Sequence, residues 1–222
     1  MSNDAEILLK NPWFARQKPA LREALLARAR IARADAGQWI YGTGDALNGL
    51  YGVLEGTVHL LMTLPDGETR LLDVVPSGQF FGQPARFGGG PRLVTAIAGE
   101  PARLLYVSDQ ALAEIARGQP DVWRNFAGLL YGQLAGALLL AGILMHMPPS
   151  RRVAARLALL AQSSDDVRVT QDQLAEMTGL SRKTVNGHLR TLEMRGVISR
   201  NYRAIQIHDL KYLSGSVRNF RA

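Results

Sequence analysis

The feature that most limits how this chain can fold is its stretch from residue 126 to 147, which contains no Asp, Glu, Lys or Arg. A run this apolar forms a helix that must be covered by protein or by lipid. Three glycines recur at every fourth position within it: Gly128, Gly132 and Gly136. Each glycine inside a helix costs about 1 kcal/mol relative to alanine, and close helix–helix contact would offset that cost. We therefore predict a long helix over 121–147 whose glycines form the seam of a homodimer.

The same stretch leaves a second interpretation open, in which residues 126–147 cross a membrane and tether a signalling regulator. Its length matches the hydrocarbon core of a bilayer, and its glycine spacing occurs in membrane helix dimers. Against this interpretation, the N-terminal sequence MSNDAEILLK has no signal-peptide pattern, and a span would separate the two ends of the chain. The chain also has no cysteine, which agrees with the cytosol. We expect a cytoplasmic protein with no membrane partner.

Upstream of this helix the pattern changes to short apolar runs separated by turn residues. The runs lie at 39–41, 50–54, 58–62, 70–75 and 103–107. The sequence Pro-Asp-Gly at 65–67 stands between two of them and is typical of a hairpin. Short strands at such even spacing predict an all-β barrel or roll. Residues 6–34, in contrast, have apolar residues at helical spacing.

The net positive charge of the chain comes entirely from its last third. Residues 1–147 hold 13 Lys and Arg against 13 Asp and Glu, whereas residues 148–222 hold 13 against 6, so 148–222 carries the whole net charge of +7. Such a concentration of charge indicates a polyanionic partner, and nucleic acid is the commonest.

A helix-turn-helix motif is predicted within this basic segment, at about 170–195. Thr170 and Gln173 have the spacing of a capping box, which starts a helix. Gly179 permits the left-handed backbone of a tight turn, and Ser181 caps the next helix. The inner side of that helix is apolar: Val185, Leu189 and Leu192. A small hairpin at 197–207 follows and forms a basic wing.

The outer face of the second helix carries groups that read base edges in a major groove. Arg and Lys donate to guanine O6 and N7, and Asn pairs bidentately with adenine. Hydroxyl and N–H groups at helix starts bind phosphates. The predicted contacts to double-stranded DNA are Thr170, Gln171, Ser181, Arg182, Lys183, Asn186, Arg190 and Arg200. Arg200 lies in the wing and is expected to touch a phosphate.

These motifs resemble the CRP/FNR family of bacterial regulators, the cyclic-AMP receptor protein and its relatives. The strongest part is VTQDQLAEMTGLSRKTVNGHLRTLE at 169–193, and the second is LYGVLEGTV at 50–58 with PSGQFFG at 76–82. The resemblance implies an α+β fold with an N-terminal β-roll like the cyclic-nucleotide-binding jelly roll, a long dimerisation helix and a C-terminal winged helix-turn-helix. It also implies a sequence-specific transcription regulator with RNA polymerase as a partner.

The domain boundaries that follow from this resemblance are 1–120 for an effector or sensor domain, 121–147 for the dimerisation helix and 148–222 for the DNA-binding domain. Within the last of these, Arg182 falls where the family places a base-reading Arg. Lys183 stands where the cyclic-AMP receptor protein has an acidic reader, so the preferred DNA sequence should differ from that protein's.

The effector pocket implied by the resemblance departs from the cyclic-nucleotide pattern. Its candidate residues are Gly82, Gln83, Arg92, Thr95, Ala137 and Leu138. In cyclic-nucleotide binders a Gly-Glu pair holds the ribose hydroxyl, and Arg followed directly by Ser or Thr holds the phosphate. Here Gln replaces the Glu, two residues separate the Arg from the Thr, and the helix pair offers no polar atoms. We therefore expect DNA binding without an effector, or a small-molecule effector more apolar than cyclic AMP.

No catalytic, metal or cofactor site is expected. The absence of cysteine removes thiolate metal sites, iron–sulfur clusters and cysteine-ligated haem. Paired catalytic carboxylates, a nucleophile elbow and a P-loop do not occur in the sequence. His59 and His146 are isolated on a predicted strand and at a predicted helix end, so we interpret both as structural. The chain is predicted not to be an enzyme.

Overall fold

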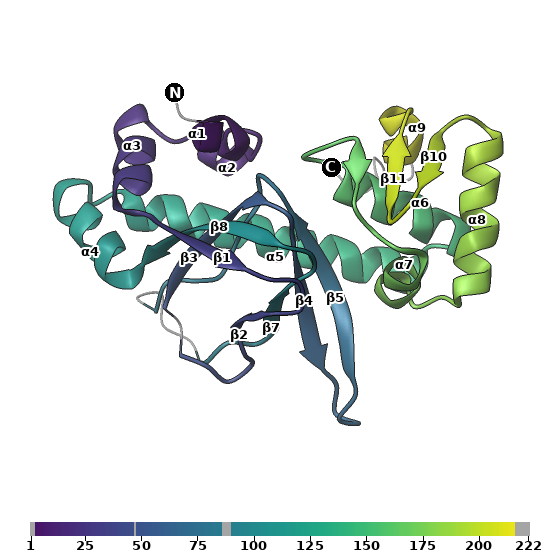
Figure 1. The fold of residues 1–222 in the computed structure, drawn as a ribbon, viewed down its shortest axis with the longest axis horizontal. Coiled ribbons are helices and arrows are strands. Elements are labelled where there is room, and N and C mark those ends of the chain that lie inside the picture. Colours follow the sequence, from purple (N-terminus) through teal and green to yellow (C-terminus); the bar gives the residue numbers. More distant parts are fainter. Residues whose placement is uncertain (1–2, 47, 86–89, 216–222) are drawn as a thin grey trace. The chain divides into compact units, whose positions relative to one another are not determined.

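The computed structural model describes residues 3–46, 48–85 and 90–215, and its contacts divide the chain into two compact units (Figure 1). The first unit is Met1–Leu134 and the second is Ala135–Ala222, so the boundary lies inside helix α5 (Val122–His146). The finer division at residues 120 and 147 stays a prediction.

The first unit is a β-rich domain with helices at both ends of its sequence. Its strands are β1 (Arg30–Ala34), β2 (Trp39–Tyr41), β3 (Gly49–Glu55), β4 (Thr57–Thr63), β5 (Thr69–Pro76), β6 (Phe80–Phe81), β7 (Thr95–Ala98) and β8 (Ala102–Ser108). They form two antiparallel four-stranded sheets, in the orders β1-β8-β3-β6 and β2-β7-β4-β5. The predicted α+β class and β-rich N-terminal domain are confirmed.

The helices of this unit are α1 (Asn3–Leu8), α2 (Pro12–Ala15), α3 (Pro19–Arg28), α4 (Asp109–Gly118) and the first part of α5. The expectation that residues 6–34 are helical is wrong after Arg28. Residues 30–34 form β1 instead, because they pair with β8 from Arg30 opposite Tyr106 to Ala34 opposite Ala102. Distant pairing thus overrides a local spacing that suits a helix.

Two apolar clusters hold the first unit together. One joins the helices to the first sheet, and its members include Leu8, Phe14, Leu25, Leu50, Phe80, Leu105, Leu112, Phe126 and Leu129. The other lies between the two sheets, and its members include Tyr41, Tyr51, Val53, Val58, Phe81, Ala96 and Leu104. The start of α5 is part of the first cluster, since the Trp13 indole donates to the Asn125 carbonyl at 2.7 Å and its ring lies 5.3 Å from that of Phe126.

The second unit contains the rest of α5 and a winged helix-turn-helix. Its other elements are α6 (Pro149–Leu160), β9 (Asp166–Val167), α7 (Gln171–Thr178), α8 (Arg182–Met194), β10 (Ile198–Asn201), β11 (Ala204–Ile207) and α9 (Leu210–Gly215). Figure 1 shows the β10–β11 hairpin beside α8. Val167 of β9 pairs with Ile205, which extends the hairpin to a sheet with the order β10-β11-β9.

Candidate nucleic-acid interface and effector pocket

The turn between α7 and α8 is built as the sequence predicts. The Thr170 hydroxyl accepts from the Gln173 N–H at 3.2 Å, and the Gln173 side chain accepts from the Thr170 N–H at 2.8 Å. Gly179 has a φ of 63°, in the left-handed region that only glycine adopts without strain. The Ser181 hydroxyl then accepts from the Thr184 N–H at 3.1 Å and caps α8.

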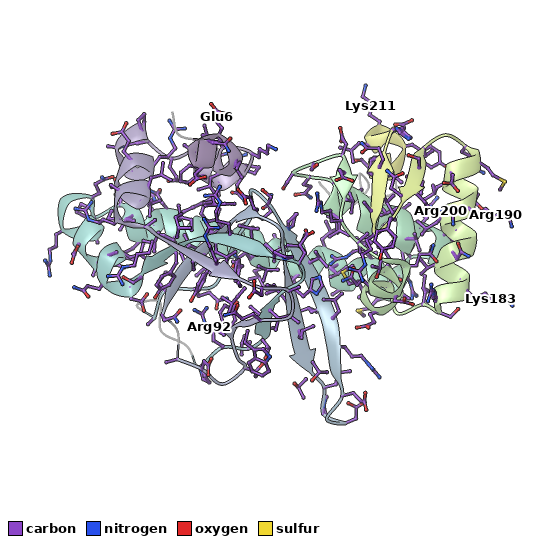
Figure 2. All side chains as sticks on the ribbon, viewed as in Figure 1. Glu6, Arg92, Lys183, Arg190, Arg200 and Lys211 are labelled. Carbon is purple, nitrogen blue, oxygen red and sulfur yellow. The ribbon has the colours of Figure 1, made fainter. Side chains whose placement is uncertain are left out.

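Helix α8 separates its apolar residues from its polar ones. Val185 and Leu189 are fully buried and Leu192 is 7 % exposed, which seats the helix on the core of the unit. Four polar side chains are exposed on its other side: Arg182, Lys183, Asn186 and Arg190. Figure 2 shows Lys183 and Arg190 extending from α8 away from the β10–β11 hairpin. We call these four residues the reading face.

Two members of the reading face have acidic or basic neighbours that the sequence spacing did not predict. The Arg182 guanidinium lies 3.2 Å from the Asp172 carboxylate of α7, and both side chains are more than 60 % exposed, at 67 % and 61 %. Asn186 accepts at 2.7 Å from the guanidinium of Arg200, in β10. Arg200 is also paired with Glu193 at 2.6 Å, so it joins the wing to α8.

The remaining predicted DNA contacts lie at helix starts. Gln171 is the first residue of α7 and is half-buried. The hydroxyls of Thr170 and Ser181 already cap their helices, so the groups left for phosphates are the hydroxyl protons and nearby backbone N–H groups.

In the first unit, the predicted pocket residue Arg92 is a buried cation, 2 % exposed. Its guanidinium lies 4.2 Å over the ring of Tyr41, and its Nη2 donates to the Asn48 side chain at 2.7 Å. Its Nε and Nη1 are buried and have no hydrogen-bond partner among the described residues. Buried donors are nearly always satisfied, so these two nitrogens are candidate donors to a ligand.

Aromatic side chains surround this cation. Tyr51 stacks on Phe81 at 5.1 Å and on Tyr106 at 4.8 Å. Burial raises the pKa of Tyr41 to about 12, against the opposing effect of Arg92, so its phenol is neutral at physiological pH. Neither Tyr41 nor Asn48 was predicted as a pocket residue, because each lies far from Arg92 in sequence and belongs to no motif.

Gly82 is part of the same pocket. It has a φ of +80°, and a Cβ there would lie 3.0 Å from the Tyr51 ring and 3.3 Å from Nη1 of Arg92. Any larger residue would therefore be strained and would crowd the free guanidinium nitrogen. Its neighbour Gln83 is half-buried.

The other predicted pocket residues are Thr95 in β7 and the α5 pair Ala137 and Leu138. The Thr95 hydroxyl accepts from the Thr43 N–H at 3.0 Å and lies 3.1 Å from the Thr43 hydroxyl, so it holds the turn before β3. Ala137 and Leu138 are exposed on α5, in the second unit.

Helix α5 presents its three predicted seam glycines to solvent. A Cβ placed on Gly128, Gly132 or Gly136 would meet nothing within 4 Å. Large apolar side chains are exposed on the same helix, including Tyr131 at 75 % and Leu138 at 65 %. By length and composition α5 is also the one helix of the described residues that is apolar enough to cross a membrane. Within those residues, no group of three or more His, Asp or Glu forms a metal site.

Comparison with known proteins gives a consistent result for both units. Residues 32–119 match the cyclic nucleotide-binding domain, and residues 151–215 match the Crp-like helix-turn-helix domain. The cyclic AMP receptor protein of Thermus thermophilus is 31 % identical over 179 residues, covering 80 % of this chain and 83 % of that protein. The CRP-like cAMP-activated global transcriptional regulator of Mycobacterium tuberculosis is 26 % identical, covering 96 % and 99 %.

The structure of FixK2 from Bradyrhizobium japonicum has the same fold, with a TM-score of 0.74 and 21 % identity over 84 % of this chain and 96 % of that one. The resemblance inferred from the sequence motifs is thus confirmed along nearly the whole chain. Regulators of this family are soluble, non-enzymatic proteins that bind DNA and typically dimerise. The chain belongs to the CRP/FNR family of DNA-binding transcription regulators.

Proposed function

We propose that this protein is a cytoplasmic, homodimeric regulator that reads a specific DNA sequence with helix α8. The observation that carries the proposal is the reading face, where Arg182, Lys183, Asn186 and Arg190 are exposed together on one helix of a helix-turn-helix. Such side chains supply the donors that distinguish base pairs in the major groove. Thr170, Gln171 and Ser181 would contact the phosphates beside it.

Selection of bound fragments from random DNA tests this proposal. A dimer should select a roughly palindromic site whose half-site centres lie about one helical turn, ~34 Å, apart. A variant with both Arg182→Ala and Lys183→Ala is the control, and it should lose the base preference while remaining folded. Selection of no common sequence by the unaltered protein would refute the proposal.

We propose that the dimer forms along α5, with Gly128, Gly132 and Gly136 at the seam. Support comes from the open space over these glycines and from the exposed apolar residues beside them. Gly132→Leu should shift the protein from dimer to monomer in sedimentation, because a large side chain forces the helices apart. Ala141→Leu is the matched control, because Ala141 is exposed on the same helix and lies on the side opposite Gly132. A dimeric Gly132→Leu variant with unchanged DNA affinity would contradict the seam.

The alternative, a membrane span at 126–147, is less well supported. Phe126 and Leu129 belong to the core of the first unit, and Ile143 is only 1 % exposed. Moving the helix into lipid would uncover the rest of that core, and losing a buried Phe side chain alone costs about 3–5 kcal/mol. Protein that purifies in high yield without detergent would dismiss the span.

For the first unit we propose an effector that carries one anionic or strongly accepting group beside an apolar or aromatic body. The free Nε and Nη1 of Arg92 supply the donors, and the Tyr41, Tyr51 and Phe81 rings supply the apolar wall. Cyclic AMP fits less well. Gln83 is a weaker ribose partner than a carboxylate, and the Thr95 hydroxyl is bonded to Thr43.

Calorimetric titration with cyclic AMP and cyclic GMP tests this proposal, with Arg92→Met as the control. We expect weak binding or none, without a gain in DNA affinity, because each unpaired polar group costs about 1–3 kcal/mol. Micromolar binding with a large gain in operator affinity would show the proposal to be wrong. RNA polymerase is the protein partner we propose, and transcription in vitro from a selected site would show whether the regulator activates or represses.

A further inference from the structure

Three side chains of the second unit form a connected cluster between α8 and the wing. Arg200 of β10 donates to Glu193 from Nε at 2.9 Å and from Nη2 at 2.6 Å, and its backbone N–H donates to the same carboxylate at 3.1 Å. The remaining guanidinium nitrogen, Nη1, donates to Oδ1 of Asn186 at 2.7 Å. All three nitrogens of the Arg200 guanidinium are therefore engaged inside the protein.

This arrangement makes Arg200 a poor phosphate ligand. Its side chain is 29 % exposed and its charge is balanced by Glu193 at 2.6 Å. The same interaction lowers the pKa of Glu193, so the carboxylate is fully charged at physiological pH. To contact a phosphate, Arg200 would have to release a charged partner and the amide of Asn186. The sequence-based expectation of a wing–phosphate contact is thus replaced by a role within the protein.

The cluster also fixes the orientation of the Asn186 amide. Arginine has donors only, so the atom of Asn186 that faces it must be the carbonyl oxygen, and the NH₂ group must point the other way. Asn186 is exposed on the reading face, so this NH₂ group is available to a base. Pairing with adenine needs both groups, because Oδ1 accepts from the N6 amine while Nδ2 donates to N7.

Because Nη1 of Arg200 already donates to Oδ1, a base amine that approaches this oxygen meets a second N–H donor beside it. At the exocyclic position of the major-groove edge, guanine O6 and thymine O4 accept from the free NH₂ group, whereas the amines at adenine N6 and cytosine N4 are donors and oppose it. Adenine then keeps only N7 as an acceptor for this group. Resting on the proposed function of α8, we propose that Arg200 is a positioning residue that makes Asn186 prefer the keto bases guanine and thymine over adenine and cytosine at one position of each half-site.

The experiment compares sequence selection by the full-length protein, Arg200→Lys and Asn186→Ala. Lysine keeps the charge but has no rigid fork, so it cannot hold Glu193 and Asn186 together. The unaltered protein should favour keto bases about tenfold at one position, in the range of a single base contact. Arg200→Lys should lose that preference and keep the other positions and the salt dependence. Asn186→Ala should also remove the preference, and combining it with Arg200→Lys should change nothing further at that position.

Two further variants separate this role from a structural or phosphate role. Arg203→Gln removes a wing charge whose ring contact is with Tyr202, and it should leave the preference unchanged. Glu193→Gln releases the other side of Arg200 and should weaken the preference as Arg200→Lys does. Thermal unfolding of each variant verifies that it is folded, and Asn186→Ala changes only an exposed side chain.

The inference is overturned if Arg200→Lys selects the same bases as the unaltered protein while Arg200→Ala loses affinity for every sequence alike with a shallower salt dependence, because Arg200 would then contact a phosphate. A preference for adenine at the Asn186 position in the unaltered protein would also overturn it. If the unaltered protein selects no sequence at all, the proposed function fails as well. The experiment therefore distinguishes the two failures.

Discussion

Arginine is used in opposite ways in the two units of this protein. In the first unit, Arg92 is 2 % exposed and lies over an aromatic ring, and two of its nitrogens have no hydrogen-bond partner among the described residues. In the second, Arg182 is 67 % exposed and pairs with an exposed Asp172. A buried cation is costly until an acceptor reaches it, whereas an exposed one remains hydrated and available.

This difference indicates the kind of partner that each unit takes. We expect a small ligand beside Tyr41, Tyr51 and Arg92 to supply acceptors for the donors of Arg92. A long polyanion cannot enter such a site, but it can lie along an exposed helix and exchange surface ion pairs for phosphates. The excess charge of 13 basic over 6 acidic residues in 148–222 serves the second purpose, and the balanced composition of 1–147 fits the first.

The largest expected effect is the salt dependence of DNA binding. If a dimer contacts six or more phosphates, affinity should fall about 10³-fold or more between 50 and 200 mM salt, since counterions are released on binding. Fluorescence anisotropy with a labelled site measures the slope. Arg92→Met should leave that slope unchanged because its charge is buried in the other unit. A slope near zero would mean that the excess positive charge of the second unit does not bind DNA phosphates, and the proposed difference between the two units would be wrong.

The next effect concerns a single reader. Arg182→Ala should weaken specific binding by about 1–3 kcal/mol and relax the preference at one base position per half-site. Its exposed pair with Asp172 is worth at most about 1 kcal/mol, so Asp172→Asn should leave affinity unchanged or slightly raised. Binding titrations against single-base variants of the selected site give both values. Equal loss on every DNA sequence would show that Arg182 does not read a base.

A smaller effect, a gain in folding stability, is expected when the buried cation Arg92 is removed. Arg92→Met should raise the free energy of unfolding by about 1 kcal/mol, because it removes two buried donors that lack acceptors at the expense of one hydrogen bond to Asn48. Arg182→Met, on an exposed side chain, should stay within about 0.5 kcal/mol. Urea denaturation of both variants makes the comparison. A clear loss of stability in Arg92→Met would show that Arg92 is already satisfied without a ligand.

The smallest effect comes from the ion pair that attaches α1 to β8. Arg103 holds Asp4 at 2.7 Å and lowers the pKa of that carboxyl below its ordinary value of 3.8. The pair therefore contributes stability above about pH 4 and loses it as pH falls through the lowered pKa. Asp4→Asn should cost less than about 1 kcal/mol at pH 7 and less again at pH 2, whereas Glu6→Gln on the same helix should cost nothing at either pH. Equal effects of Asp4→Asn at both pH values would contradict this.

The second unit was predictable from sequence in more detail than the first. The capping box at Thr170 and Gln173, the left-handed Gly179 and the cap at Ser181 are local devices, each decided by residues within a few positions of one another. The position of the four reading-face residues on one side of α8 follows directly from helical spacing. In the first unit, the spacing of the apolar runs predicted the β-rich domain, and its longer strands match those runs to within one or two residues.

The parts of the fold and of the two sites that the sequence did not predict depend on long-range contacts. The sequence by itself determined where the helix-turn-helix begins and ends and where the excess positive charge lies. It also determined that the apolar helix α5 must be covered by protein or lipid. These features depend on local propensity, spacing and charge, which can be assessed from residues close together in the chain. Only the tertiary structure turned residues 30–34 into a strand, placed Tyr41 over Arg92 and joined Arg200 to Asn186. These depend on backbone pairing and side-chain packing between residues 14 to 76 positions apart, and no local pattern encodes which distant partner a buried cation or a wing arginine will meet.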